Sequence, residues 1–475
     1  MFLGSVGGAA AADRALPRSD VRLLFLKRFT FGARARDVER IRVAGPRAWL
    51  EEQLHLERDA ALEARLSDLS VPGMSSSTAR GRSSRVVAAQ MQAQKILRAV
   101  YGENQLHEVM VDFWMNHFNV NVDKEGVAPY LAEYEREVIR PHALGRFGDM
   151  LRAVARSGAM LVYLDNWMSF GPESPAARSA LRAGNSPRTL NENYARELLE
   201  LHTLGVDGGY TQKDVEEAAR VLTGWTVPRI GERFEFDESR HDDESKTVLG
   251  LRFPAGGGAE EGERLLRYLA THPTTCEFIA RKLCRRFVSD DPPRALVYRV
   301  ASAFQGSGGD IPTALRELAL SPEFARRSVW RAKVKSPLEL AVSAVRAVDA
   351  EVRDPALLAA EIEGMGQALY KCAPPTGYPD TGQAWLSPGS FLKRVSFAAD
   401  FADGLGRGVR VPLEPFLALK SADRVERVLV ERLLDNEAAA ATRHSLLGTL
   451  QGKVSATTVR EALRLTLGSP EFQKR

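Results

Sequence analysis

The sequence predicts a large, mainly α-helical protein with one small β-hairpin-like insertion near residues 228–253. Apolar residues recur at helical spacing through most of the chain, and helix start and stop signals bound these segments. Only between Val227 and Phe253 does the pattern change, since residues 233–237 alternate between polar and apolar with period two and a β-rich stretch follows. These observations together favour the mainly α class.

The expected helical segments follow one another along the chain with few interruptions. Gly45-Pro46 starts a new helix, because proline is tolerated in the first helical turn. Thr211 and Asp214 have the spacing of a helix N-cap, so another helix begins there. We expect a loop at 70–84 and helices over 19–66, 85–120, 127–164, 188–204, 211–222 and from 260 onwards. We divide the chain into a helical body, 1–330, and a helical C-terminal region, 331–475.

Composition bounds the class of protein. The chain has 475 residues, 27% charged and 44% hydrophobic, which is typical of globular proteins. With 65 basic and 61 acidic residues, the net charge of +4 is close to balance, so we expect no nucleic-acid partner. The sequence lacks a Cys-x-x-Cys pair and any apolar run of about 18 residues, so we expect neither a zinc ribbon nor a membrane span.

The N-terminal sequence MFLGSVGGAAAADRAL is small and apolar. It lacks the basic start of a secretory signal, although its alanine run resembles a cleavage site. We therefore favour a cytoplasmic protein over an exported one.

The run from Leu190 to Val206 is the densest cluster of groups able to do chemistry. At about 100° per residue, four polar side chains share one face of the expected helix: Asn193, Arg196, Glu197 and Glu200. His202 lies at the edge of the apolar face. The simplest interpretation is an amphipathic helix in which Arg196 pairs with Glu200 four positions later.

The alternative interpretation of this run is catalytic. Glu197 and Glu200 would be metal ligands or an acid/base pair, with His202 as a further candidate ligand of a transition metal and with Asn193 and Arg196 lining the substrate. Neither Glu-x-x-His nor His-Glu-x-x-His spacing is present, which weighs against the metal site.

The segment Leu106–Asn119 offers a second cluster. His117 lies beside the apolar face next to Trp114. A histidine there is most simply a hydrogen-bonded core residue, and the alternative is a metal ligand or general base beside a tryptophan that lines the substrate.

The stretch 240–246 differs because it lies between expected strands, where binding groups are enriched. His241 can titrate near neutral pH, Asp242 can orient it, and Lys246 can bind an anion. These three residues are candidate catalytic groups, and the alternative is an Asp-rich turn in which Lys246 pairs with an acid. Trp225, just before this stretch, either belongs to the core or lines the same cleft.

The stretch 371–378 is irregular and proline-rich, with Trp385 after it. It forms either a lid or a rigid connection between helices.

Six stretches resemble the uncharacterised bacterial family called domain of unknown function 1800. They are LKRFTFGAR (26–34), LHEVMVDFWMNHFNV (106–120), NENYARELLELHTLGVDGGYTQKDV (191–215), ARVLTGW (219–225), RHDDESKTVLG (240–250) and GYPDTGQAWLSPGSFLKR (377–394). Tyr378 stands where the family pattern leads us to expect tryptophan. The resemblance implies no established activity. It does imply a sulfatase-like protein partner, because genes of the two families commonly occur together.

Two functional hypotheses follow from these patterns. The first is an enzyme whose site lies between the 190–205 helix, the 106–119 helix and the 240–246 loop, with a transition metal as a candidate cofactor. The second is a helical interaction protein that docks the sulfatase-like partner. Nucleotide-binding glycine loops, a nucleophile elbow and calcium-binding loops are absent from the sequence, which disfavours those chemistries.

Overall fold

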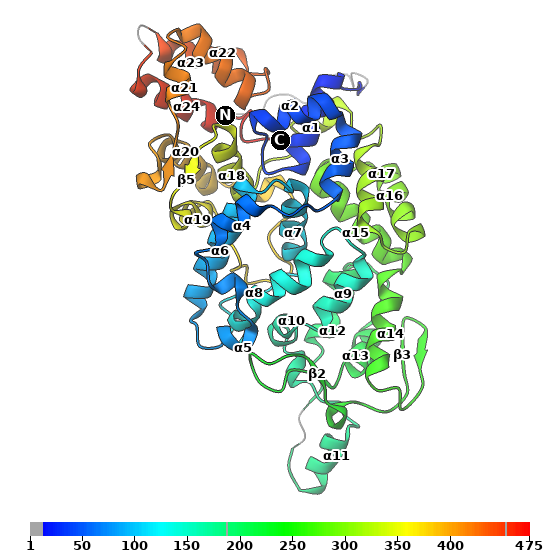
Figure 1. The fold of residues 1–475 in the computed structure, drawn as a ribbon. Coiled ribbons are helices and arrows are strands. Elements are labelled where there is room, and N and C mark those ends of the chain that lie inside the picture. The colour runs from blue at the N-terminus through cyan, green and yellow to red at the C-terminus, as the bar shows by residue number, and fades with distance from the viewer. Residues whose placement is uncertain (1–12, 187–188, 452–453) are drawn as a thin grey trace.

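The computed structural model describes residues 13–186, 189–451 and 454–475. The protein is 60% helical, and the described residues form 24 α-helices and three two-stranded antiparallel sheets (Figure 1). The prediction of a mainly α protein is therefore confirmed. In the described part of the chain, no helix is long and apolar enough to cross a membrane. The N-terminal segment on which the localisation rests lies outside the described residues.

The N-terminal helices build one side of the body. Pro46 is the first residue of α3 and Gly45 is its N-cap, as predicted. The expected loop at 70–84 was partly wrong, because it contains a short helix that Ser75 caps by accepting a hydrogen bond from the Thr78 amide. The helices are α1 (Arg18–Phe29), α2 (Ala35–Ala44), α3 (Pro46–Leu54), α4 (Ala60–Leu66), α5 (Ser76–Ala79), α6 (Ser84–Tyr101) and α7 (Gln105–His117).

The central helices surround α7 and include two stretches of π-helix, Tyr134–Ile139 and Leu198–Thr203. The second lies in the motif run, where the Leu204 amide donates to the Leu199 carbonyl five positions back. Thr211 and Asp214 form the predicted capping box. The α-helices here are α8 (Leu131–Glu133), α9 (Phe147–Ala155), α10 (Gly158–Tyr163), α11 (Pro175–Arg182), α12 (Asn193–Glu197) and α13 (Gln212–Val221).

The β structure between 225 and 253 consists of two short antiparallel ladders rather than one hairpin. Strand β2 (Glu235–Phe236) pairs with β1 (Trp225–Thr226), which precedes the expected insertion. Strands β3 (Lys246–Val248) and β4 (Leu251–Phe253) pair with each other. A third ladder, β5 (Glu351–Val352) with β6 (Val409–Arg410), had no sequence prediction.

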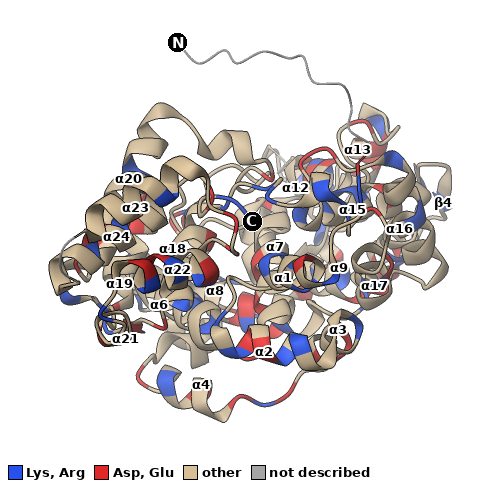
Figure 2. Cartoon of the chain, turned by 90° about the horizontal axis from the view of Figure 1, so that it is seen from above, with Lys and Arg blue, Asp and Glu red and all other residues tan. Residues whose placement is uncertain are grey.

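The remaining helices complete the right-hand side and the upper end of the molecule in Figure 1. Basic and acidic residues are interspersed along the helices that Figure 2 shows from above. The helices are α14 (Ala259–Ala270), α15 (Pro273–Phe287), α16 (Arg294–Gly306), α17 (Ile311–Ala319), α18 (Pro337–Ala347), α19 (Pro355–Gly364), α20 (Pro388–Ala402), α21 (Glu414–Leu417), α22 (Ala422–Leu433), α23 (Ala440–Leu450) and α24 (Ala456–Gly468).

The buried apolar side chains form one continuous cluster that extends from Leu16 to Phe472. Helix α18, which lies beyond the expected boundary at 330, packs against α6 and α19. Its fully buried Arg346 donates to the Val100 carbonyl at 2.7 Å and pairs with Asp37 at 2.8 Å. The division at 330 stays a prediction, and the segments on either side of it meet around the pocket described next.

Candidate functional site

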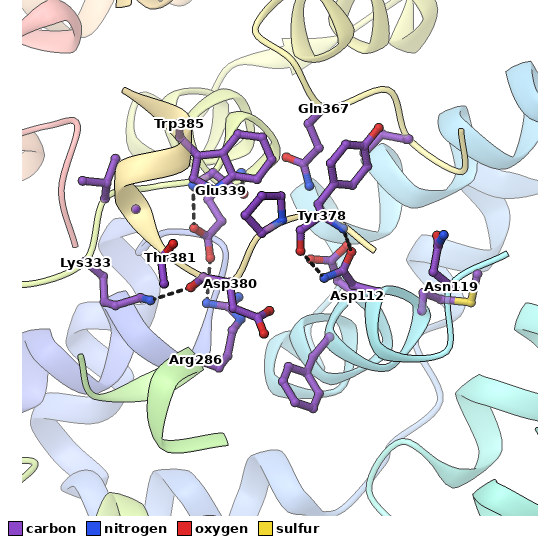
Figure 3. A pocket seen from close by; sticks show the side chains of 18 of the residues that line it. Asp112, Asn119, Arg286, Lys333, Glu339, Gln367, Tyr378, Asp380, Thr381 and Trp385 are labelled. Carbon is purple, nitrogen blue, oxygen red and sulfur yellow. Dashed lines mark hydrogen bonds and ion pairs between the residues drawn. The ribbon is translucent and has the colours of Figure 1, made fainter. Parts of the chain in front are cut away.

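The candidate site is a pocket between α7, α15, the start of α18 and the segment 367–385 (Figure 3). Its empty space, counted together with the open solvent at its mouth, is about 890 Å³. Two of the stretches that resemble the family meet here, since Asn116 and Asn119 come from one, and Tyr378 and Trp385 from the other. The pocket therefore unites segments more than 250 positions apart.

Two asparagines hold the irregular stretch 371–378 against the end of α7. Asn116 donates to the Tyr378 carbonyl at 2.9 Å and accepts from the Tyr378 amide at 2.7 Å. Asn119 donates to the carbonyls of Cys372 and Pro374 at 3.0 and 2.9 Å. Because four hydrogen bonds pin its backbone, this stretch is a rigid connection rather than a lid.

Aromatic side chains form one wall of the pocket. The rings of Tyr378 and Trp385 lie 5.9 Å apart with a tilt of 43°. The Tyr378 hydroxyl donates to the Ala368 carbonyl at 2.7 Å, and burial raises the pKa of Tyr378 to about 12. The phenol therefore stays protonated at neutral pH, and the wall is apolar except for its edges.

Charged side chains form the opposite side of the pocket. Arg286 of α15 and Arg475 pair with the same oxygen of Glu339, at 2.7 and 2.9 Å. The second Glu339 oxygen accepts from the Ser336 amide at 2.8 Å, which is the capping box of α18. One carboxylate is thus shared by two guanidinium groups and a backbone amide.

Lys333 extends the charged side towards the mouth. Its ammonium pairs with Asp290 and donates to the Asp380 carbonyl at 3.1 Å. Asp290 also accepts from the Gly382 amide at 2.8 Å, and the Asp380 carboxylate pairs with Lys282 at 3.0 Å. Burial lowers the pKa of Lys333, although its bond to Asp290 opposes that shift. A buried, paired lysine in a pocket is a common feature of binding sites.

The motif run lies elsewhere, and one expectation about it was wrong. Arg196 pairs with Glu192 at 3.1 Å, four residues before it, and not with Glu200. Glu200 instead accepts from the Tyr210 hydroxyl at 3.2 Å. The reason is the π-helix, which widens each turn and moves the residues after 198 out of α-helical register.

The position of His202 shows the effect of this change in helical register. We expected it at the edge of the apolar face, and it is fully buried. The His117 Nε2 atom lies 3.2 Å from the His202 carbonyl, and the two rings are 6.3 Å apart. The Nδ1 atom of each ring lacks a hydrogen-bond partner among the described residues. Burial lowers the pKa of His202 to about 3 and that of His117 well below its ordinary value. Both imidazoles are therefore neutral.

No group of three or more His, Cys, Asp or Glu side chains suited to a metal ion exists within the ranges that the structure describes. The two histidines come together, but Glu197 does not complete a set with them. Glu197 is half-buried, and burial together with Glu200 raises its pKa above the ordinary value. A metal held by these three residues stays a prediction.

The three candidate residues of the 240–246 stretch, His241, Asp242 and Lys246, are buried rather than exposed in a cleft. Asp242 accepts two hydrogen bonds from Arg220, at 2.8 and 3.1 Å. Lys246 pairs with Glu261 at 2.8 Å, and the His241 Nε2 atom lies 3.5 Å from the same carboxylate. No hydrogen bond or ion pair between described residues links this network to Glu197, Glu200 or the pocket. His241, Asp242 and Lys246 thus belong to a buried network of charged groups, and their catalytic role stays a prediction.

Both candidate tryptophans lie in the core. Trp114 is fully buried, and its indole N–H donates to the Ala143 carbonyl at 3.1 Å. Trp225 is buried against Gly262 and the Phe234 ring, whose centroid is 5.2 Å away. Asn193, which was also expected to line a substrate, is exposed and donates to the Leu164 carbonyl at 3.3 Å. The structure does not bring these three side chains together.

The buried neutral histidines predict an acid-sensitive fold. Unfolding exposes His202, whose pKa then rises from about 3 to about 6.5, so the unfolded chain binds more protons between these values. Stability is full above pH 6.5 and falls as the pH drops towards 3. Between pH 6 and 4 we expect His202 alone to lower the free energy of unfolding by about 2–3 kcal/mol. Urea unfolding at several pH values measures this.

The variant His202→Leu removes the titrating group and keeps an apolar side chain in place. It should flatten the pH dependence, whereas His444→Leu, at an exposed position, should leave it unchanged. An unchanged slope in His202→Leu would contradict the prediction. Elemental analysis of the same proteins tests the metal prediction, which requires about one transition-metal equivalent in the wild type and its loss in His202→Leu.

The sequence analysis missed Arg286, Lys333, Glu339 and Arg475. Each belongs to a segment that reads as an ordinary charged helix or connection, and only the fold brings them together. The available signal was the GYPDTGQAW stretch, because its irregular backbone between helices and its aromatic residues are typical of a binding loop.

The fold and the pocket define a large, mainly α-helical protein with a polar pocket between its helices. The chain belongs to the family described as protein of unknown function (DUF1800), whose model matches residues 24–474. Comparison with curated proteins and with solved structures gives no match.

Proposed function

We propose that this protein binds a small organic molecule in the pocket between α7 and the segment 367–385, and that it acts on that molecule as an enzyme. One observation supports the proposal above all. Seven charged side chains line a pocket that also has an aromatic wall: Lys95, Asp112, Arg286, Lys333, Glu339, Asp380 and Arg475. A few polar groups converging on an apolar surface are typical of ligand sites.

The enzyme hypothesis relates the pocket to the predicted acid/base pair through Tyr163, since neither glutamate lines the pocket itself. The Tyr163 hydroxyl donates to the Ala373 carbonyl at 2.8 Å, in the stretch that Asn119 also holds. The Glu197 charge contributes to raising the pKa of Tyr163. Glu197, with its own raised pKa, would be the general acid and Glu200 the base of the proposed enzyme.

Filling the pocket tests whether it is the ligand site. Thr381 lines the pocket, is partly exposed, and its hydroxyl makes no hydrogen bond to a described residue. In Thr381→Phe the added ring occupies the ligand's space, and we expect fragment binding to weaken at least about tenfold. Ligand-observed NMR with a library of small aromatic and aliphatic acids, amines and alcohols measures this on the full chain.

Gln383→Phe is the matched control, since it adds the same ring two positions along at an exposed residue that does not line the pocket. Fragments that bind the wild type should bind this variant equally well. Equal binding to all three proteins would refute the pocket as the site.

An exposed apolar face supports the second candidate function, docking of the sulfatase-like partner. Phe391, Leu392 and Val395 of α20 are 51%, 67% and 45% exposed, and Leu386 before the helix is 44% exposed. Such a patch is typical of an interaction surface. Co-elution of the two purified proteins, abolished by Leu392→Asp, would support docking, and separate elution would count against it.

A further inference from the structure

Positive charge is in excess around the pocket's charged side. Four cations cluster there, namely Arg28, Arg286, Lys333 and Arg475, and two carboxylates, Glu339 and Asp290, lie among them. Burial is nearly complete for Arg28, Lys333 and Arg475, whose residues are at most 4% exposed. Lys282 and Asp380 pair with each other, so their charges cancel and do not change the net charge of the cluster. The side chains of the cluster therefore sum to about two positive charges at neutral pH.

Arg28 shows that this excess is not compensated inside the protein. Its residue is completely buried, and its Nη2 atom donates to the Val329 carbonyl at 2.5 Å. Its Nε and Nη1 atoms lack hydrogen-bond partners among the described residues, and no carboxylate of these residues lies within ion-pair distance. Burial lowers the pKa of Arg28 to about 9, so it remains charged at neutral pH. Buried charges are normally paired, because desolvation without a partner is costly.

Arg286 is the cation that can reach a ligand. Its Nη1 atom pairs with Glu339 at 2.7 Å, and Arg475 pairs with the same carboxylate oxygen. Its Nε and Nη2 atoms make no hydrogen bond with another described residue, and Figure 3 shows the guanidinium beside Asp380 at the side of the pocket that faces the aromatic wall. A guanidinium with two free donors in a fixed fork suits a two-oxygen acceptor.

We propose that the ligand of this pocket is an organic oxyanion, a carboxylate or a sulfate or phosphate monoester. Its head group binds the free donors of Arg286 beside Lys333, and its apolar body lies along Tyr378 and Trp385. The inference rests on the proposed function, because it names the chemistry of the molecule that the pocket binds. The head group supplies negative charge, which offsets the positive charge that Glu339 and Asp290 do not neutralise.

The test compares charged and neutral probes of the same shape on the full chain. Benzoate, phenyl sulfate and phenyl phosphate carry the three head groups, and benzamide is the neutral counterpart. Titration calorimetry at constant ionic strength should show at least one anion binding about tenfold or more tightly than benzamide, as expected for charge-assisted hydrogen bonds. The anion that binds most tightly identifies the head group.

Variants at Arg286 decide whether this residue is responsible. Arg286→Gln should weaken anion binding at least about tenfold, and Arg286→Lys, which keeps the charge without the fork, should be intermediate. Glu339 retains Arg475 and the Ser336 amide in both variants, so the fold is preserved. Arg294→Gln, at an exposed position on α16, is the control and should bind as the wild type does.

Two results would overturn the inference. One is equal binding of benzamide and all three anions, and the other is full anion affinity in Arg286→Gln. If Thr381→Phe still blocks the neutral probe in either case, the pocket remains the ligand site and only the anionic character is wrong. If Thr381→Phe blocks none of the probes, the proposed function itself fails.

Discussion

Replacing Asp242 with asparagine is expected to lower the free energy of unfolding by about 2–3 kcal/mol, because it removes the buried negative charge that accepts two hydrogen bonds from Arg220. Asp242 is fully buried and accepts both hydrogen bonds of the Arg220 fork, while the Lys246 ammonium lies 3.9 Å away. Asparagine has the same shape but no charge. Urea unfolding at pH 7 measures the loss.

The pH dependence of this loss follows from the shifted pKa. Burial on its own would raise the pKa of Asp242, but the bonds and charge of Arg220 outweigh burial and lower it. Because the pKa of Asp242 is lower in the folded than in the unfolded protein, the carboxylate stabilises the fold above the unfolded value of about 4. This stabilisation is lost as the pH falls below that value towards the folded pKa. The difference between wild type and Asp242→Asn should therefore shrink in acid.

Asp243→Asn is the matched control, since Asp243 is partly exposed and makes no side-chain hydrogen bond to a described residue. A loss under about 1 kcal/mol in Asp242→Asn would mean that the network is not a stabilising element. If Asp242→Asn unfolds as expected but binds fragments normally below its unfolding transition, the predicted catalytic role of this stretch would be unsupported.

The variant Gly377→Ala is expected to lower the free energy of unfolding by about 2–4 kcal/mol and to remove ligand binding. Gly377 has φ +71°, which costs other residues about 1–2 kcal/mol. An added Cβ would also lie 2.6 Å from the Asn116 Oδ1 atom and closer still to the Asn116 carbonyl, which adds about 1–3 kcal/mol of overpacking. The overlap between the added Cβ and Asn116 is relieved only if the 371–378 stretch moves away from α7, and Tyr378 then moves with it.

Gly366→Ala separates the two contributions. Gly366 has φ +106°, but nothing lies within 4 Å of an added Cβ, so this variant suffers backbone strain alone and should bind fragments normally. Gly364→Ala, in α19 with ordinary φ and open space, should be neutral or slightly stabilising. Equal losses in Gly377→Ala and Gly366→Ala, with binding intact, would show that the Asn116 contact does not hold the pocket.

Local signals predicted much of this fold. Gly45-Pro46 starts α3 and Thr211 with Asp214 caps α13, because proline geometry and side-chain caps act within one helical turn. The change of pattern after Val227 likewise located the short strands. Strands β3 and β4 form a hairpin inside the expected insertion, whereas β2 pairs back to Trp225, which lies before it.

The candidate site was less accessible to sequence reasoning. A constant 100° per residue placed His202 at a helix edge and Arg196 on the same face as Glu200, within pairing distance, and the π-helix at Leu198–Thr203 changed both. The run also packs against α7, where the His117 ring lies beside the His202 carbonyl. Side-chain spacing within the run does not encode that contact.

The sequence by itself determined the mainly α class, many helix boundaries and the family, because periodicity, caps and motifs are local properties of the chain. Only the tertiary structure decided which charged groups are buried together. Asp242 and Lys246 joined Glu261 in an internal network, while Arg286, Glu339 and Arg475 met at one pocket. Ion pairing acts through a few ångströms of space whatever the separation along the chain, so the fold had to be known before the pocket was visible.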